Sequence, residues 1–508
     1  MHIILINVPS RKGEGGKFLP LGLLYLGGII ERCGHSVNII DPYCIDSELK
    51  SFDREDYSDI DEIIRVHQPK IICFGGIASS YGRTKKLSKY IHKNYPDIFQ
   101  IAGGPLASVY ELLLQNTSIN LIFHGETENT FPHFLDKFEK NENWEMINGI
   151  SYLKDHLIMR NPIVAQIENL DTIPFPSYHL VKLENYYDSM LRIVDAFASE
   201  HSNKFNYENA IESISQGGSI IPIMTSRGCT HKCNFCYRHM TGYRQHSVSY
   251  VIDHIKFLFA NYGLKGFSFA DELFNFKKEW VLEFCDAIDR EKLGIYYLIA
   301  GARVDKIDRE ILQRLKETGC IYIAYGQESG SETILKEYRK GVIPKRNTEI
   351  TLLSKECGLI CPVQIVIGSP GETQKTINET ISFLIDVGTE IPSLNYLLPF
   401  PETPIWKYVT ENKLIPDIET YLDEVAEKGG GPIVNLTQVP DRLWRRWGFI
   451  IQNEVKLSKY KKKGQTAYYL ILFPIIKIQN FFCPFLPKKI TMSFVKGVLS
   501  KIKNSTGL

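Results

Sequence analysis

The sequence predicts an α/β protein with an N-terminal doubly wound parallel sheet, then a partial (β/α)6 barrel, then a mainly helical C-terminal region. Two stretches in which short β-branched runs alternate with helical segments indicate the first two units, because such alternation is typical of parallel sheets. The length of 508 residues also exceeds what a single hydrophobic core usually fills. We divide the chain into 1–145 for the first sheet, 146–215 for a linker or insertion, 216–410 for the barrel and 411–508 for the C-terminal region.

The N-terminal unit has five strand patterns with helical segments between them. The expected strands are Ile3–Val8, Val37–Asp41, Ile71–Gly75, Gln100–Ala102 and Leu121–His124, and the expected helices include Leu19–Cys33, Ile60–Val66 and Thr84–Asn94. Sheets of this kind bind ligands at the carboxyl ends of their strands. Small residues gather at three of these ends, as Gly75-Gly76, Gly103-Gly104-Pro105 and Gly125-Glu126, so a large ligand can approach the backbone there.

The barrel is predicted from a second series of strands, which begins after an irregular stretch. In that stretch, Pro174-Phe175-Pro176 indicates an extended linker, and the polar segment Ser199–Gly218 is predicted to be a mobile insertion. The expected barrel strands are Ile220–Thr225, Gly266–Ala270, Ile295–Ala300, Tyr322–Gly326, Val363–Gly368 and Leu394–Leu398. Six strand–helix units predict a partial barrel, whose active residues belong at the carboxyl ends of the strands.

Charge and cysteine usage argue against several classes of protein. Val455 to Leu508 holds eleven lysines and no acidic residue, whereas the whole chain has a net charge of only +1. The rest of the chain is therefore acidic overall, and we do not expect a general nucleic-acid binder. Eleven scattered cysteines indicate no disulfide framework and fit a reducing cytoplasm. We expect no secretory signal, and the longest apolar stretch, Ala467–Ile476, falls short of the roughly 20 residues that a membrane span needs.

The lysine-rich C-terminal tail allows two interpretations. Lys456, Lys459 and Lys461–Lys463 precede aromatic and aliphatic runs, a combination that suits the edge of an anionic bilayer. A helical cap over the barrel mouth, with solvated lysines, fits the same pattern equally well. Peripheral membrane contact through the tail would favour a lipid or other hydrophobic substrate.

Three cysteines directly follow the first expected barrel strand. Cys229, Cys233 and Cys236 have the spacing C-x3-C-x2-C, and three soft thiolates on one tight loop can hold three irons of a four-iron cube. The fourth iron then has no protein ligand and is open to a chelating substrate. The alternative is a zinc site with His231 as fourth ligand. Closed zinc sites usually combine two C-x2-C pairs, however, and the spacing of His231 is poor for a tetrahedron.

The segment from about 220 to 405 resembles the radical SAM superfamily, whose signature is C-x3-C-x-aromatic-C. The resemblance implies that the three cysteines ligate a [4Fe–4S] cluster, that S-adenosylmethionine (SAM) chelates the open iron, and that Phe235 lies near the adenine. One electron, from a donor such as flavodoxin or ferredoxin, then cleaves SAM to methionine and a 5′-deoxyadenosyl radical. No catalytic residue beyond these is identified from the sequence.

The same resemblance assigns SAM contacts to the ends of the later barrel strands. The expected contacts are Asp271, Glu272, Arg303, Gly326, Glu328 and Ser329, together with Gly368 and Pro370 in the run Gly368-Ser369-Pro370-Gly371-Glu372-Thr373. A carboxylate of the Asp271-Glu272 pair would hold the SAM amino group, and Arg303 the SAM carboxylate. A helix N-cap, a surface salt bridge and a simple turn are the plainer alternatives for these motifs. In the element Pro399–Pro404, Glu402 stands where the family has Gly, which leaves the backbone conformation open there.

The N-terminal unit resembles the Rossmann-like cobalamin-binding domain that is fused to one branch of radical SAM enzymes. The residues that carry the resemblance are Pro20–Leu26, Gly34–Asp41, Gly75-Gly76, Gly103-Gly104-Pro105 and Gly125–Glu128. It implies cobalamin contacts at Gly75, Gly76, Ser79, Gly103, Gly104, Pro105, Gly125 and Glu126. The D-x-H-x-x-G loop of base-off cobalamin proteins is missing after Asn7, so we expect no protein ligand to cobalt, and His35 is interpreted as a turn residue. The alternative is a domain that is kept for packing or that binds another nucleotide.

The two resemblances together imply a cobalamin-dependent radical SAM enzyme of the cytoplasm, either free or associated with a membrane. We expect it to methylate an unactivated carbon of a small-molecule or lipid substrate. Radical ring formation or rearrangement by the same machinery is the alternative within this class. A cobalamin- or SAM-binding redox sensor without turnover is the alternative from another class, and a radical SAM enzyme without cobalamin is a third.

Overall fold

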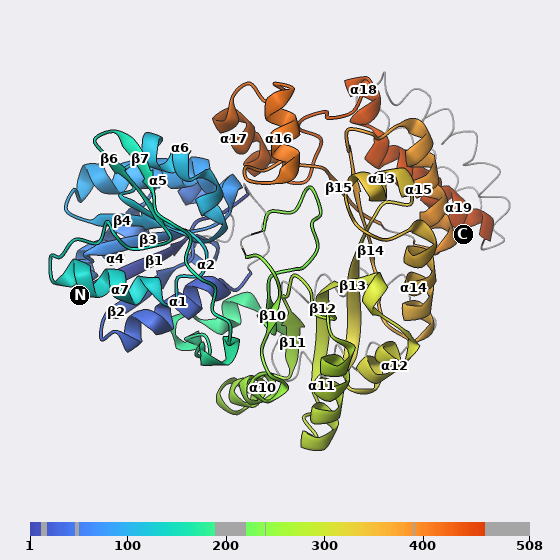
Figure 1. Ribbon diagram of the computed structural model, residues 1–508, viewed down its shortest axis with the longest axis horizontal. Coiled ribbons are helices and arrows are strands. Elements are labelled where there is room, and N and C mark those ends of the chain that lie inside the picture. Colours follow the sequence, from blue (N-terminus) through green and yellow to red (C-terminus); the bar gives the residue numbers. More distant parts are fainter. Residues whose placement is uncertain (12–17, 46–49, 188–219, 239, 390–391, 463–508) are drawn as a thin grey trace, which may run out of the picture.

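Two α/β units lie side by side in the structure, a computed structural model, and C-terminal helices contact both of them (Figure 1). The structure describes residues 1–11, 18–45, 50–187, 220–238, 240–389 and 392–462. The predicted insertion Ser199–Gly218 lies outside the described residues, and so does the tail from residue 463 onward. Within the described ranges, no helix is long and apolar enough to cross a membrane.

The N-terminal unit is built on a seven-stranded sheet. Its strands are β1 (His2–Asn7), β2 (Ser36–Ile40), β3 (Ile71–Gly75), β4 (Phe99–Ala102), β5 (Leu121–Phe123), β6 (Ile150–Lys154) and β7 (Leu157–Arg160). They pair in the order β2-β1-β3-β4-β5-β6-β7; β1 to β5 are parallel, and β6 and β7 are antiparallel. The five predicted strands are confirmed. The hairpin of β6 and β7 has no counterpart among them, and it extends the sheet past the boundary expected at residue 145.

Helices cover both faces of this sheet, as a doubly wound fold requires. They are α1 (Leu21–Arg32), α2 (Pro42–Ile45), α3 (Lys50–Asp53), α4 (Ser58–His67), α5 (Tyr81–Asn94), α6 (Tyr110–Asn116) and α7 (Thr130–Glu139), with a 3-10 helix at Ala78–Ser80. Ile30 of α1 and Phe134 of α7 share a buried cluster with Leu5 of β1. Leu87 of α5 belongs to the opposite cluster, with Ile4 of β1. Because neighbouring side chains of a strand point to opposite faces, a strand covered on both sides reads as a continuous apolar run.

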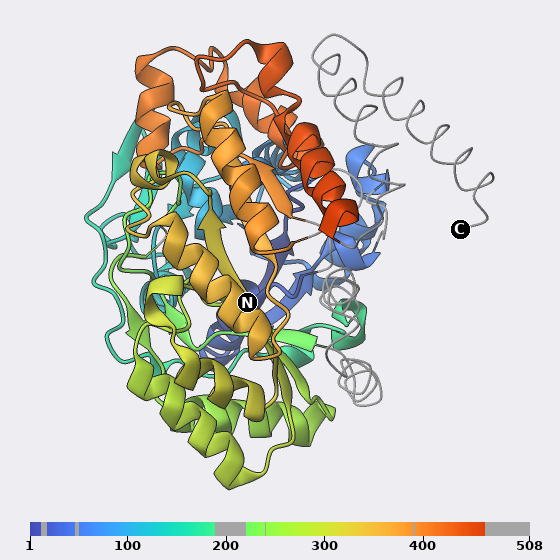
Figure 2. The same cartoon turned by 90° about the vertical axis from the view of Figure 1, so that its right-hand side faces the viewer.

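The second unit is a six-stranded parallel half-barrel, as predicted. Its strands are β8 (Ile220–Ile223), β11 (Gly266–Phe269), β12 (Tyr296–Ala302), β13 (Cys320–Glu328), β14 (Val363–Ile367) and β15 (Ser393–Tyr396), and they pair in this order. Its helices are α10 (Val248–Tyr262), α11 (Lys278–Glu291), α12 (Arg309–Glu317), α13 (Glu332–Glu337), α14 (Pro344–Glu356) and α15 (Gln374–Asp386). Figure 2 shows α14 and α15, in yellow and orange, lying along the outer face of this sheet.

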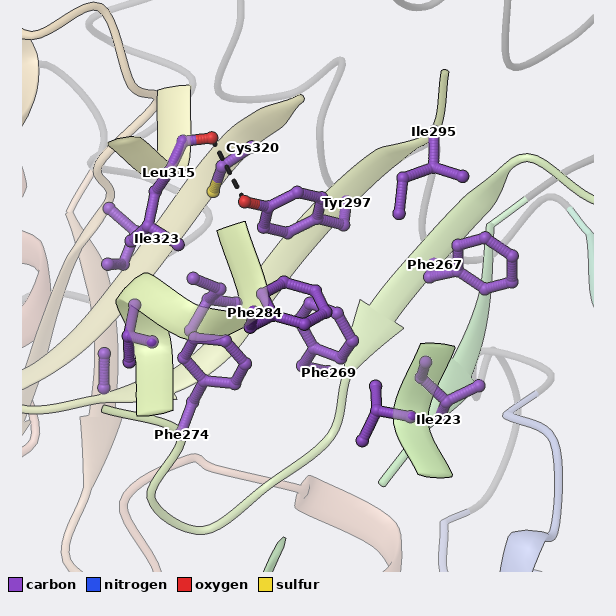
Figure 3. Close-up of a cluster of buried hydrophobic side chains, with 14 of the residues drawn as sticks. Ile223, Phe267, Phe269, Phe274, Phe284, Ile295, Tyr297, Leu315, Cys320 and Ile323 are labelled. Atoms are coloured by element: carbon purple, nitrogen blue, oxygen red, sulfur yellow. Dashed lines mark hydrogen bonds between the residues drawn. The ribbon is translucent and has the colours of Figure 1, made fainter. Parts of the chain in front are cut away.

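Aromatic side chains fill the space between the half-barrel and its helices (Figure 3). Phe269 of β11, Phe284 of α11 and Tyr297 of β12 are fully buried in one cluster. The phenol of Tyr297 donates a hydrogen bond of 3.1 Å to the backbone oxygen of Leu315, which satisfies the only polar atom of that ring. This core fixes the strands whose carboxyl ends carry the predicted site residues.

The C-terminal helices divide between the two units. They are α16 (Pro404–Glu411), α17 (Ile418–Lys428), α18 (Asp441–Trp444) and α19 (Trp447–Lys462). Tyr421, Leu422 and Val425 of α17 are buried in the core of the N-terminal unit, beside α5 and α6. Trp444 and Trp447, from α18 and α19, instead belong to a buried cluster with β14 and α15. The helical character expected for the C-terminal region is confirmed as far as residue 462, and its described helices pack against two different units.

The packing of α17 gives a stability prediction. Leu422 has no exposed surface, so Leu422→Ala leaves a cavity in the N-terminal core and should lower the free energy of unfolding by about 2–5 kcal/mol. Denaturant unfolding of the full chain measures this change. Leu352→Ala on α14 is the control, because Leu352 is 43% exposed and its truncation should change the free energy by less than about 0.5 kcal/mol. Equal effects of the two changes would contradict the packing described here.

Candidate functional site

A cavity of about 540 Å³ lies between the two units. One wall is formed by the carboxyl ends of β3, β4 and β5 and by the start of α1. The other wall is formed by residues just before the cysteine loop and by the residues that follow β11. The first wall includes Gly75, Gly76, Gly103, Gly104, Pro105, Gly125 and Glu126, and the second includes Ser226, Arg227, Gly228, Ala270 and Glu272. Its volume lies within the usual range of cofactor and ligand pockets, about 300–1,000 Å³.

Seven of the eight residues predicted to contact cobalamin line this cavity, and Ser79 does not. Ser79 is buried in the 3-10 helix that follows β3. Gly125 has a φ of +73°, in the left-handed region that favours glycine. A side chain at Gly75 would lie 2.8 Å from Leu23 of α1, so this glycine allows the helix to pack closely against the strand end.

The cysteine loop is held by a small antiparallel pair of strands, β9 (Ser226–Arg227) and β10 (Arg244–Gln245). Gly228 follows β9 with a φ of +79°, and a Cβ atom there would lie 2.6 Å from the backbone oxygen of Gly242. Only glycine fits this crossing of the two loop ends. Farther along, the amide of Asn234 donates to the backbone oxygen of Glu337 at 2.8 Å, which ties the loop to the end of α13.

The three cysteines differ in exposure: Cys233 is buried, Cys229 is half-buried and Cys236 is exposed. A hydrogen bond from the Cys236 thiol, followed by the charges of Lys340 and Arg303, lowers the pKa of Cys233 despite its burial. Thiolates are the form that binds iron, and three of them on one loop match the donor set of a four-iron cluster with one open corner. Among the described residues, no group of three His, Cys, Asp or Glu side chains is already arranged around a common point.

The two carboxylates that follow β11, Asp271 and Glu272, lie in different environments. Asp271 is buried and accepts three hydrogen bonds of 2.7 Å, from the backbone N–H and the hydroxyl of Thr225 and from the N–H of Ser226. It therefore anchors the start of the cysteine loop. Glu272 is exposed within the cavity wall and pairs with no described side chain. Of the two carboxylates predicted to hold the SAM amino group, Glu272 is the one that is free to do so.

Two predicted SAM contacts are already engaged in ion pairs beside the cysteine loop. The Arg303 guanidinium donates to the carboxylate of Asp305 and to the backbone oxygen of Lys340, each at 2.7 Å. Glu328, with a left-handed φ of +63°, accepts a hydrogen bond of 2.9 Å from the Lys340 ammonium, and both side chains are nearly buried. A side chain at Gly326 would collide with this pair. Lys340 is thus a charge next to the cysteines for which the sequence gives no signal.

The remaining predicted SAM contacts lie at different depths. Phe235 stacks edge-on against Tyr338, with 5.0 Å between ring centroids. Ser329 is buried, and its hydroxyl lies 3.1 Å from that of Thr380 in the interior. Gly368 has a φ of +99°, and Pro370 is half-buried in the turn that follows β14. The structure therefore places Arg303 and Glu328 next to the cysteine loop, of which Phe235 is itself a part, and encloses Ser329 in the core.

Glu402, which stands where the family element has Gly, adopts a backbone conformation that favours glycine. Its φ is +63°, in the left-handed region. Its carboxylate lies 3.4 Å from the guanidinium of Arg160, at the end of β7 in the N-terminal unit. With Glu at this position, the turn is left-handed and the side chain forms an ion pair between the two units.

Glu372, in the turn after β14, gives a prediction on pH. Its buried carboxylate accepts a hydrogen bond from the backbone N–H of Gly368, and burial raises the pKa to about 8 from an ordinary value of 4.5. Between these two pH values the folded chain holds a proton that the unfolded chain releases, so rising pH favours unfolding. We expect the unfolding free energy to fall from pH 5 to pH 8, and Glu372→Gln to reduce this fall.

Unfolding curves at several pH values measure the difference between the two proteins. The exposed Glu411 provides the control, because Glu411→Gln should leave the pH profile unchanged. A wild-type profile that is flat over this range, or one that rises, would contradict the assignment to Glu372.

Comparison with known proteins identifies both units. Residues 223–384 match the Radical SAM superfamily, and residues 14–135 match the B12 binding domain. The chain is 28% identical to "Uncharacterized methyltransferase PH0819" of Pyrococcus horikoshii, over 82% of this chain and 84% of the relative. It is 23% identical to the anaerobic magnesium-protoporphyrin IX monomethyl ester cyclase of Cereibacter sphaeroides, over 83% of this chain and 66% of that protein.

A solved structure has the same fold over nearly the whole chain. It is the cobalamin-dependent S-adenosylmethionine radical enzyme OxsB with aqua-cobalamin bound, with a TM-score of 0.66 and 16% identity. The likeness covers 98% of this chain and 75% of OxsB. The matching domains, the cysteine loop and the glycine-lined cavity lead to one conclusion. The chain is a radical SAM enzyme with a B12-binding domain, and its relatives include proteins named as methyltransferases and cyclases.

Proposed function

We propose that this enzyme transfers a methyl group to an unactivated carbon of a small-molecule or lipid substrate. The observation that carries the proposal is a shared cavity: the glycine-rich strand ends of the first unit and the start of the cysteine loop line the same space. A cobalamin at the first wall and a SAM on the loop would face the same space. When bound, SAM and the cluster supply a 5′-deoxyadenosyl radical, and cobalamin supplies the methyl group.

The residues of the chain prepare this space for radical chemistry. Leu21, Leu23 and Leu26 of α1, with Phe131 of α7, make much of the wall apolar, which keeps water away from reactive species. Glu272 offers a carboxylate to a cationic amine. Asp271 fixes the start of the cysteine loop through Thr225 and thereby sets where the cluster lies.

Ring formation is a second candidate, because the relative from Cereibacter sphaeroides is a cyclase. The name of the relative from Pyrococcus horikoshii favours methylation. The sensor without turnover is disfavoured, since the chain belongs to an enzyme family. A flavodoxin or ferredoxin in the cytoplasm is the proposed electron donor. Membrane contact through the tail stays a prediction, because most of the tail lies outside the described residues.

The cluster assignment predicts the effect of removing one thiol. Cys233→Ala should abolish most of the iron bound after anaerobic reconstitution, and with it the formation of 5′-deoxyadenosine from SAM, because the cube loses one of three protein ligands. Iron analysis and chromatography of the nucleosides measure both. Cys357, half-buried at the end of α14, provides the control: Cys357→Ala should keep iron and activity. Normal iron content in the Cys233 variant would contradict the assignment.

Methylation and ring formation differ in their by-products. Reduced protein loaded with cobalamin is incubated with trideuteromethyl SAM and a small-molecule and lipid extract. Methylation predicts S-adenosylhomocysteine together with 5′-deoxyadenosine, and a trideuteromethyl group in a product found by mass spectrometry. Formation of 5′-deoxyadenosine alone, with no transferred label, would favour ring formation or rearrangement instead. Omission of cobalamin should remove the labelled product but not the cleavage of SAM.

A further inference from the structure

One buried carboxylate lies between the B12-binding unit and the cysteine loop. Glu126, just after β5, accepts a hydrogen bond of 3.1 Å from Arg227 on one oxygen. Its other oxygen accepts hydrogen bonds of 2.7 Å from Arg244 and from the backbone N–H of Ile167. Only 2% of the side chain is exposed. Although Glu126 lines the cavity, its carboxylate is bonded to Arg227, Arg244 and Ile167, which all lie outside the B12-binding unit.

The two arginines stand at the two ends of the cysteine loop. Arg227 of β9 precedes Gly228 and Cys229, and Arg244 of β10 lies directly opposite it in the strand pair. One carboxylate therefore holds both the entry and the exit of the segment that carries all three cysteines. Asp271 holds only the entry, through Thr225 and Ser226.

Neighbouring groups strengthen the contact. Glu128 forms a second ion pair with Arg227, at 2.6 Å, and the guanidinium of Arg227 lies over the ring of Tyr25, 5.5 Å from its centroid. Arg244 is more dependent on Glu126, because its Nε and one terminal nitrogen are buried and have no hydrogen-bond partner among the described residues. Loss of Glu126 would leave that guanidinium buried with only the backbone oxygen of Ile167.

The same residues face the cavity in which cobalamin would lie. Gly125, Glu126, Thr127 and Glu128 all line it, and Arg227 lines it from the other side. We propose that Glu126 is a positioning residue that couples occupancy of the B12 cavity to the position of the cysteine loop. A group that fills the cavity fixes the segment 125–128, and this segment fixes both ends of the loop through Glu126. By linkage, a cluster on the loop strengthens binding in the cavity by the same factor.

This inference goes beyond the proposed methyl transfer, and its test needs no substrate. The cluster is reconstituted anaerobically, and loss of iron to the chelator ferrozine is followed with and without saturating hydroxocobalamin, whose binding is checked by its absorbance. The ratio of the two rates measures how far bound cobalamin protects the cluster. We expect cobalamin to slow iron loss in the wild-type protein by at least about fivefold, the low end of typical coupling between sites. In Glu126→Gln the ratio should fall to about one.

Glu419 offers a matched control. It also joins two parts of the chain, because this residue of α17 accepts hydrogen bonds of 2.9 Å from Lys85 and Asn116 of the N-terminal unit. None of its hydrogen bonds within the described residues involves the cysteine loop. Glu419→Gln removes the same charge and should keep the wild-type ratio. Hydrogen exchange of peptides from 226–245 gives a second measurement, with slower exchange on cobalamin binding in the wild type and not in Glu126→Gln.

A milder variant guards against failure of Glu126→Gln to fold. Arg244→Lys keeps the positive charge opposite Glu126, but its flexible side chain lacks the planar guanidinium that holds one nitrogen, Nη1, against both Glu126 and Ile167. Its ratio should therefore lie between those of the wild type and Glu126→Gln. A wild-type ratio of one overturns the proposal. An unchanged ratio in both Glu126→Gln and Arg244→Lys also overturns it. The same holds if the ratio falls as far in Glu419→Gln as in Glu126→Gln.

Discussion

Buried carboxylates hold the cysteine loop, and the arrangement of the whole site depends on them. Asp271 binds the start of the loop from within the half-barrel, and Glu126 binds both ends from the B12-binding unit. The cysteine loop joins two short strands, β9 and β10, and contacts with the rest of the protein therefore have to fix its position. Charge-assisted hydrogen bonds in a buried setting supply that position more sharply than apolar packing would, because their geometry is directional.

Much of the fold follows from local patterns in the sequence. The central strands of the first sheet are covered on two faces, and a run such as Ile71–Gly75 is therefore apolar enough to be recognised on its own. In the half-barrel, Val363–Ile367 is recognised from its β-branched residues, although its burial alternates along the strand. The hairpin of β6 and β7 is not recognisable in this way, because Leu153, Leu157 and Met159 are exposed and the pattern does not separate core from surface. The pattern of α17 reveals an apolar face, but nothing local tells which distant unit that face will cover.

The site residues also differ in whether a local pattern in the sequence reveals them. Cys229, Cys233 and Cys236 can be found from the sequence because their chemistry depends on spacing within one loop. The pairing of Lys340 with Glu328, or of Arg244 with Glu126, joins residues from different elements and needs the assembled fold. A polar residue at the end of a strand does not always face the ligand site. Glu272 lines the cavity, whereas the side chains of Asp271 and Ser329 form hydrogen bonds inside the protein.

The place of α17 has a consequence for how the chain comes to fold. The core of the N-terminal unit contains side chains from residues 421–425, so this unit is assembled from two distant stretches of sequence with the whole half-barrel between them. During synthesis from the N-terminus, the B12-binding unit would leave the ribosome with one apolar surface uncovered and keep it so until the half-barrel had also been made. The half-barrel thus acts as an insertion into the B12-binding unit, and completion of the first domain waits for completion of the second.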